Sequence, residues 1–361
     1  MYRIILIFIV FVPAYDANLC GCKSMRKCYV DMLNILKDKD EEACVENVAT
    51  GAGTVMIFLK ALKQYCPEVV KVEEKYVTYE GRHLYEVIVT NNTAKHVDDD
   101  TKPVILIEAG QLAGSESTNL VLVLIQQLAA CIEYEDMIEK VKWVILPCTN
   151  PDGLEYTRYN RVQWKKNLKP SDDQMNHGVD LSRNFDHQWS ACKKRGNSFS
   201  PQYPGLSPFS ENETRFVRDV MNRYKNQARA YISVRKNGHS LLFPYAYTKV
   251  KVDDEAQYKK VAEKIVEKIN QRAGIIQLFS SESIFSMNGK AHCGHSVDYA
   301  FDLGIPNSFE MRVFLGSETE VVTKFQSLPR GYHNSLLLGY LSGFKKLYEI
   351  ITTDKSKNAH F

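Results

Sequence analysis

The amino-acid sequence predicts an α/β protein: a single domain with a mixed, largely parallel central sheet that helices cover on both faces. Residues 104–108 and 141–147 are short and apolar except for Glu108 and Lys142, as strands of a parallel sheet are when both of their faces are buried. Segments with strand and helix patterns alternate along the chain, without an internal repeat or a low-complexity linker. This alternation favours one α/β domain over separate all-α and all-β units.

Hydrophobic spacing and turn signals predict the individual elements. Apolar residues recur at helical spacing in five segments, at 55–62, 118–130, 215–224, 253–273 and 335–350. Residues 67–90 alternate in the manner of two strands joined by a Tyr-Glu-Gly turn, and further strands are expected at 231–234, 276–278 and 308–311. The sequence TNPDG at 149–153 predicts a turn after the second buried strand.

Size and charge point to a globular protein whose partners are neither nucleic acids nor membrane surfaces. The chain has 361 residues, enough for one large α/β domain or two small ones. Its net charge is +3, with acidic and basic residues interspersed and no basic stripe.

The N-terminal residues 1–17 predict a cleavable secretory signal. Arg3 precedes an apolar run at 4–12, and small residues follow at Ala14 and Ala17. The run is short for a membrane span, although it would also suit a buried N-terminal strand. We therefore expect a secreted, extracellular protein that has no membrane attachment once the signal is removed.

Nine cysteines agree with an oxidising environment. Five of them crowd the first 66 residues, which predicts a short cysteine-rich segment at 18–53 with disulfides among these cysteines and to Cys66. Because nine is odd, at least one thiol is free or pairs between chains. Two N-x-Thr sequences, at Asn91 and Asn212, predict glycosylation, and residues 351–361 predict a polar tail.

The most informative stretch runs from 178 to 214 and contains GVDLSRNFD and YPGLSPFSENET. The first string predicts a strand that ends in a polar turn, with Arg183 between Ser182 and Asn184. A guanidinium framed by amide and hydroxyl groups is suited to binding a carboxylate bidentately. The second string predicts a loop and a helix with Ser210 as N-cap and Glu213 completing a capping box. An ordinary strand–loop–helix connection is the alternative interpretation.

As a string, this stretch resembles the zinc metallocarboxypeptidases of the carboxypeptidase A/B family, and the resemblance is continuous over 54–350. It implies a carboxypeptidase-like domain over those residues, a role for Arg183 in holding the terminal carboxylate of a peptide, and Ser182 in place of a helper Asn. IPNSFEMR resembles the family's strand with the general acid/base, which implies that role for Glu310. YNRVQWKKN implies that Arg161 stabilises the oxyanion, and CGHSVDYAFD implies that Val297 makes the specificity pocket apolar.

The same resemblance places unsuitable residues at the family's zinc-ligand positions. EAGQLAGSES puts Leu112 at the first His and Ser115 at the Glu, or Glu116 if one residue is skipped, while YISVRKNGHSLLFPYAY puts Arg235 at the later His. Leu has no lone pair and Arg stays protonated, so neither binds Zn²⁺, which needs three protein ligands. We therefore predict no zinc and no other cofactor. Histidines at 239, 292 and 295 leave open a relocated site.

Three functions remain open from the sequence. The first is a catalytically inactive secreted homologue that binds peptide or protein C-termini with an apolar last side chain. The second is an active metallocarboxypeptidase with a non-standard zinc site, and the third is an extracellular interaction protein that does not use the old pocket. Because Glu310 would lose its cation in the absence of zinc, we predict that Arg235 pairs with Glu310, or with Glu116. The oligomeric state stays open.

Overall fold

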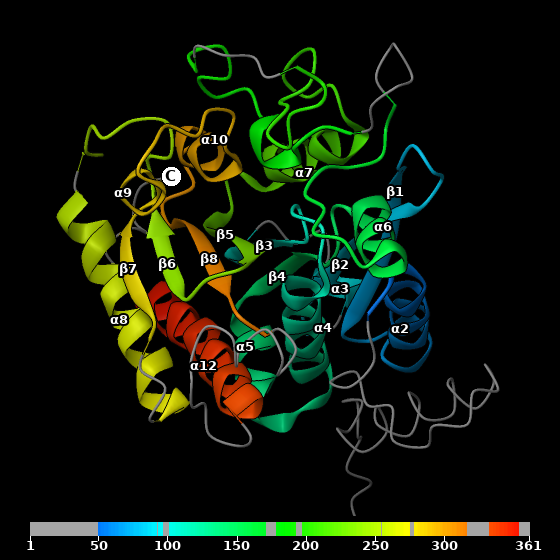
Figure 1. Ribbon diagram of the computed structural model, residues 1–361. Coiled ribbons are helices and arrows are strands. Elements are labelled where there is room, and N and C mark those ends of the chain that lie inside the picture. The colour runs from blue at the N-terminus through cyan, green and yellow to red at the C-terminus, as the bar shows by residue number, and fades with distance from the viewer. Residues whose placement is uncertain are drawn as a thin grey trace, which may run out of the picture.

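The computed structural model describes residues 50–91, 93–96, 101–170, 178–192, 197–253, 255–274, 278–315 and 332–353. The expected signal at 1–17, most of the 18–53 segment and most of the 351–361 tail lie outside these residues. In the described part of the chain, eight strands form one sheet in the order β1-β2-β4-β3-β5-β8-β6-β7 (Figure 1). Their bounds are β1 Val70–Val77, β2 His83–Val89, β3 Val104–Ala109, β4 Lys142–Leu146, β5 Ala228–Lys236, β6 Ser240–Phe243, β7 Ser280–Ser283 and β8 Ser308–Val313.

The centre of the sheet is parallel and its edges are mixed. Strands β4, β3, β5 and β8 run parallel to one another. At one edge β1 and β2 are antiparallel, and at the other β6 runs antiparallel to β8 with β7 parallel to β6. The predicted mixed, largely parallel sheet is confirmed.

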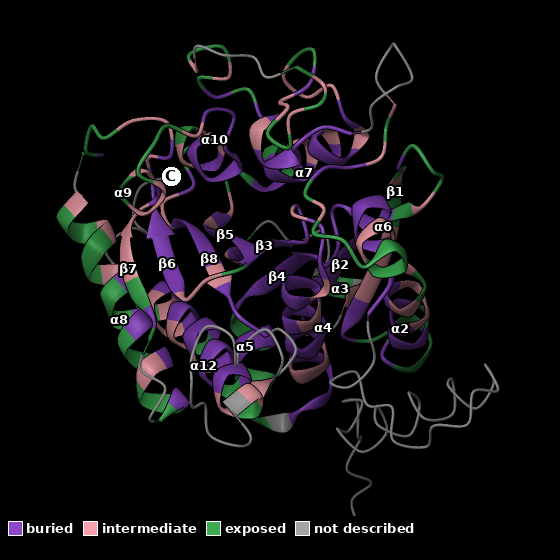
Figure 2. Ribbon diagram, in the orientation of Figure 1, coloured by how far each residue is buried: buried purple, intermediate pink, exposed green. Residues whose placement is uncertain are grey.

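Helices cover both faces of the sheet, because its central strands are apolar on both sides. On β3, Ile105 and Ile107 face one core cluster while Val104 and Leu106 face the other. The first face is covered by α2 (Ala52–Tyr65), α4 (Ser115–Ala130), α5 (Glu135–Lys140), α8 (Glu255–Ala273) and α12 (Tyr332–Thr353). The second is covered by α7 (Asn212–Tyr224) and α10 (Ser296–Asp302). Figure 2 shows the sheet buried between these helices.

The shorter elements connect these layers. They are α3 (Thr93–His96), η1 (Ile132–Tyr134), α6 (Pro151–Asn160), η2 (Leu181–Arg183) and α9 (Ile284–Asn288). The predicted turn at 149–153 is in fact the start of α6: the Asn150 side chain caps the Gly153 N–H at 2.9 Å, and Pro151 occupies the first helical position.

Three further predictions need correction. The expected strand before Arg183 is η2, because the Asp180 carboxylate binds the Ser182 N–H at 3.1 Å and its Oγ–H at 2.6 Å, which closes a turn. Helix α7 has Glu211 at its N-cap instead of Ser210, whose hydroxyl donates to the Glu211 side chain. The strand expected at 276–278 is found at β7 instead, and residues 276–277 lie outside the described ranges.

The cysteines are only partly described. Cys192 and Cys293 form a disulfide, and Cys148 is a buried free thiol. Cys66 and Cys131 each take part in a disulfide. The unpaired thiol expected from an odd count is therefore confirmed, whereas the predicted pairing of the N-terminal cysteines lies outside the described residues. None of the described helices is both long and apolar enough to cross a membrane.

Candidate functional site

A cavity of about 230 Å³ lies at the carboxyl ends of the central parallel strands. Leu112 follows β3, Arg235 and Lys236 end β5, and Glu310 and Arg312 lie on β8. In open α/β sheets this edge is where ligands bind. Of the site residues expected from the sequence, Ser182, Arg183 and Glu310 line this cavity.

Strand register explains why these charges meet. Glu108 on β3 pairs with Ser233 on β5, and Ser233 pairs with Glu310 on β8, so the three side chains form one row. Two residues further along each strand, on the same face, Arg235 pairs with Arg312. The guanidinium groups of Arg235 and Arg312 therefore lie next to the row that contains the carboxylates of Glu108 and Glu310.

The Glu310 carboxylate is fully buried and has three charged or polar partners. Arg235 Nη1 lies 3.1 Å from its Oε2, His295 Nε2 lies 2.7 Å from the same oxygen, and Arg312 Nε lies 2.5 Å from its Oε1. Burial alone would raise the pKa of Glu310, but the Arg235 charge, the His295 hydrogen bond and the Arg312 charge hold that pKa well below its usual value. Glu310 is thus a fixed anion at neutral pH.

The predicted ion pair of Arg235 is confirmed, and its partner is Glu310 and not Glu116. Its side chain is 3% exposed and also donates to Gln111 Oε1 at 2.9 Å and to Ser233 Oγ at 3.2 Å. Glu116 accepts a 3.4 Å hydrogen bond from the Leu315 N–H and is not among the residues that line the cavity. The guanidinium therefore takes the role of counter-charge to Glu310.

The donor set does not fit Zn²⁺. Leu112 lines the cavity at one expected ligand position and Arg235 occupies another, and the carboxylate nearest to Arg235 is already bound by three groups. Within the described residues, no three side chains of His, Cys, Asp or Glu gather in a way that could hold a metal ion. A dication would also meet the charges of two arginines here.

The three histidines do not rebuild a metal site. His295 uses Nε2 for Glu310, and its Nδ1 accepts from the Val297 N–H at 3.2 Å. His292 Nε2 lies 3.0 Å from the Ser182 carbonyl oxygen, whereas His239 packs beside Phe314. Burial and the nearby Arg235 charge lower the pKa of His295 to about 4, so its imidazole is neutral at physiological pH.

Arg183, to which the resemblance gave a carboxylate-binding role, lines the cavity with its guanidinium held by Asp180. Its Nε donates to Asp180 Oδ2 at 3.1 Å, which fixes the plane of the guanidinium, and it lines the cavity beside Ser182. Among the residues that the structure describes, neither Nη atom of Arg183 has a hydrogen-bond acceptor. These donors are available to a carboxylate.

Two other sequence-predicted site residues lie away from the cavity. Arg161 is exposed where α6 ends, in a left-handed conformation with φ 51°, and it does not line the cavity; Lys165 does. Val297, on α10, is fully buried in the core and is likewise not a lining residue. The sequence alone does not show which of these two basic residues reaches the cavity.

Lys236 was not singled out from the sequence, yet its side chain lies across Gly114. A Cβ added at Gly114 would come within 2.7 Å of Lys236 Cδ and 2.8 Å of its Nζ. The missing side chain at 114 therefore provides the space in which Lys236 lies. Only the pairing of the two positions in the fold reveals this relation.

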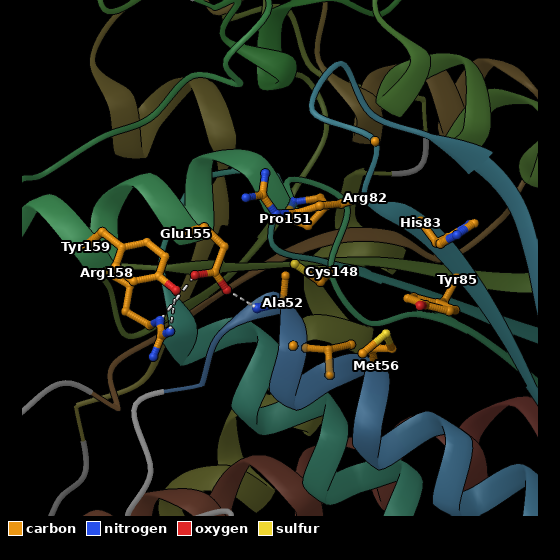
Figure 3. A pocket seen from close by; sticks show the side chains of 13 residues that line it. Ala52, Met56, Arg82, His83, Tyr85, Cys148, Pro151, Glu155, Arg158 and Tyr159 are labelled. Atoms are coloured by element: carbon orange, nitrogen blue, oxygen red, sulfur yellow. Dashed lines mark hydrogen bonds and ion pairs between the residues drawn. The ribbon is translucent and has the colours of Figure 1, made fainter. Parts of the chain in front are cut away.

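A larger cavity of about 390 Å³ lies between α2, the β1–β2 hairpin and α6 (Figure 3). There the Glu155 carboxylate accepts hydrogen bonds from the Ala52 N–H at 2.5 Å and from Arg158 Nε at 3.2 Å. It therefore serves to cap the N-terminus of α2. Burial raises the pKa of the Cys148 thiol to about 12, so this lining residue is not a nucleophile at neutral pH. The charged cavity at the strand ends remains the candidate site.

Comparisons with known proteins agree with the fold. The chain is 29% identical over 260 residues to carboxypeptidase B of Helicoverpa zea, covering 70% of this chain and 59% of that protein. It is 28% identical to zinc carboxypeptidase A 1 of Drosophila melanogaster, covering 82% and 70% of the two chains. The crystal structure of carboxypeptidase A from Helicoverpa armigera superposes with a TM-score of 0.77 at 21% identity, over 93% of this chain and 82% of that one. The zinc carboxypeptidase family model matches residues 55–332, and the chain therefore belongs to the zinc carboxypeptidase family.

Proposed function

We propose that this protein is a secreted, non-catalytic zinc-carboxypeptidase homologue that binds the C-terminal carboxylate of peptides or proteins. The observation that carries the proposal is the environment of Glu310, which Arg235, Arg312 and His295 hold as a permanent anion. A general base works best when its pKa lies near the operating pH. A carboxylate whose pKa is held well below its usual value accepts a proton poorly. Among the described residues, no group of His, Cys, Asp or Glu side chains could hold a metal ion to assist it.

Binding is supported by Arg183. Its guanidinium is oriented by Asp180, and its Nη atoms are available at the cavity wall. A charge-assisted, bidentate contact with a carboxylate is the strongest interaction that the cavity offers. With one such contact and no metal, we expect micromolar or weaker binding, about −8 kcal/mol at most.

Calorimetry with a peptide acid and the same peptide as its amide tests the binding half. The acid should bind, and both the amide and the Arg183→Met variant should lose most of the heat. Arg272→Met, an exposed change on α8, is the matched control. Equal heats for acid and amide would contradict the proposal.

Elemental analysis combined with hydrolysis of a blocked dipeptide that ends in Phe tests the catalytic half. We expect no stoichiometric zinc and no release of Phe. About one zinc per chain together with chelator-sensitive hydrolysis would establish the active alternative. Peptide mapping of the mature N-terminus from a secreting cell tests the location.

A further inference from the structure

The cavity at the strand ends is strongly cationic. Among the residues that the structure describes, six basic ones line this cavity, which we call the cationic pocket: Lys165, Arg183, Arg235, Lys236, Lys290 and Arg312. Two carboxylates line it as well, Asp180 and Glu310. The histidine in the wall adds no positive charge at neutral pH, since burial and the Arg183 charge hold the pKa of His292 well below its usual value. The balance of charge is therefore clearly positive.

Both carboxylates are already used within the protein. Asp180 accepts from the Ser182 N–H, the Ser182 hydroxyl and Arg183 Nε. Glu310 has the three partners described above. By contrast, Lys165 and Lys290 form no ion pair with any described residue, and both are exposed. The charges of these two lysines are therefore available to a ligand that enters the cavity.

These cations come from separate parts of the chain. Lys165 follows α6, Lys236 ends β5 and Lys290 follows α9, so the fold itself brings them to one cavity. Grouped like charges repel one another, which costs stability unless a ligand compensates them. Such a cost is typical of a binding site.

We propose that the cationic pocket selects peptide C-termini that carry a second carboxylate, on the side chain of the last or the preceding residue. This inference rests on the proposed function, since Arg183 receives the terminal carboxylate while the lysines receive the additional charge. The cavity volume of about 230 Å³ supports the end of a chain as the ligand. Sites for drug-sized ligands measure roughly 300–1,000 Å³. The apolar last side chain expected from Val297 has no surface to contact here, because Val297 is fully buried.

The test compares three peptides of equal length: one ending in Glu-Glu, one ending in Ala-Ala, and the Glu-Glu peptide as a C-terminal amide with its side chains unchanged. At about 0.05 M salt the Glu-Glu acid should bind about tenfold more tightly than the Ala-Ala acid, the combined effect of two or three partly exposed charge pairs. At about 0.5 M salt most of this preference should vanish. N-acetylglutamate, a free dicarboxylate, shows whether a small molecule suffices or a peptide is required.

Variants locate the effect. Lys165→Gln and Lys290→Gln, singly and together, should reduce the preference several-fold, whereas Lys264→Gln, an exposed change on α8, should not. Without ligand, the double variant should melt slightly higher than the unchanged protein because repulsion is relieved, and added Glu-Glu peptide should raise its melting temperature less.

The outcomes separate the two proposals. If Glu-Glu and Ala-Ala acids bind equally and both need a free carboxylate, the acidic preference is wrong and the C-terminal binding function stands. If the amide binds as well as the acid, the proposed function itself fails. A preference that Lys264→Gln reduces as much as the pocket variants do reflects overall charge and overturns the inference.

Discussion

Replacing Arg235 with Met tests whether this residue stabilises the site in place of a metal. The change removes one of three partners of Glu310 and leaves a fully buried carboxylate with Arg312 and His295. Breaking a buried ion pair costs about 3–5 kcal/mol. Because two partners remain, we expect a loss near the lower end, about 3 kcal/mol.

The size of the loss should depend on pH. In the unchanged protein the pKa of Glu310 is lower than in the unfolded chain, where it is near 4.5, so its stabilisation is complete above that pH and declines as the pH falls below it. Without the Arg235 charge the folded-state pKa of Glu310 rises, so protonation at acidic pH relieves the buried charge more readily. The difference in unfolding free energy between the two proteins should therefore narrow from pH 7 to pH 4.

Urea unfolding followed by circular dichroism measures both effects, with Arg272→Met as a surface control expected within about 0.5 kcal/mol of the unchanged protein. The Arg235→Met/Glu310→Leu double variant removes both charges and should recover part of the loss, as apolar replacements of buried pairs do. A loss for Arg235→Met no larger than that of Arg272→Met would refute the reasoning.

Two further predictions concern other parts of the domain. Burial, together with the nearby Glu211 charge, raises the pKa of Glu213 to about 8. Between about pH 5 and 8 the folded chain therefore keeps a proton that the unfolded chain has lost. The free energy of unfolding should fall as the pH rises through this range. Glu213→Gln should flatten this slope, at most about 1.4 kcal/mol per pH unit, in urea melts at several pH values; an unchanged slope would show that Glu213 is ionised. Gly294→Ala should cost about 3 kcal/mol or more and abolish carboxylate binding, because a Cβ there lies 2.1 Å from the Arg183 carbonyl oxygen. Gly289→Ala has a similar φ of 63° and no atom within 4 Å of the new Cβ, so it should cost only about 1–2 kcal/mol, and an equal cost for both would contradict the argument.

The fold was predictable because its core signals are local. The apolar run at 104–107 favours burial on both faces, and β3 is buried at every position. The pairing of Arg235 with Glu310 was also predictable, since a buried carboxylate without its cation demands another. The strand expected before Arg183 was wrong because a side-chain contact from Asp180 closes the turn, and such contacts have no periodicity.

The rest of the site depends on distances that the sequence does not contain. Arg161 and Lys165 are four residues apart in a basic loop, and only the end of α6 decides which of them reaches the cavity. The contact between the Lys236 side chain and Gly114 joins residues that are far apart in the sequence, so it becomes visible only in the folded structure. Burial of Val297 similarly follows from how α10 packs on the sheet, not from its own neighbours in sequence.

The three-partner arrangement around Glu310 also constrains how this chain can evolve. Arg235→His would remove a compensating charge while position 112 still holds Leu, so stability would fall before any metal could be gained. Leu112→His would add one ligand to a pocket that already repels cations. Neither change alone completes a set of metal ligands, and each lowers stability or adds a ligand where a cation is repelled. The buried Arg235–Glu310 ion pair therefore makes each of these single changes unfavourable on its own.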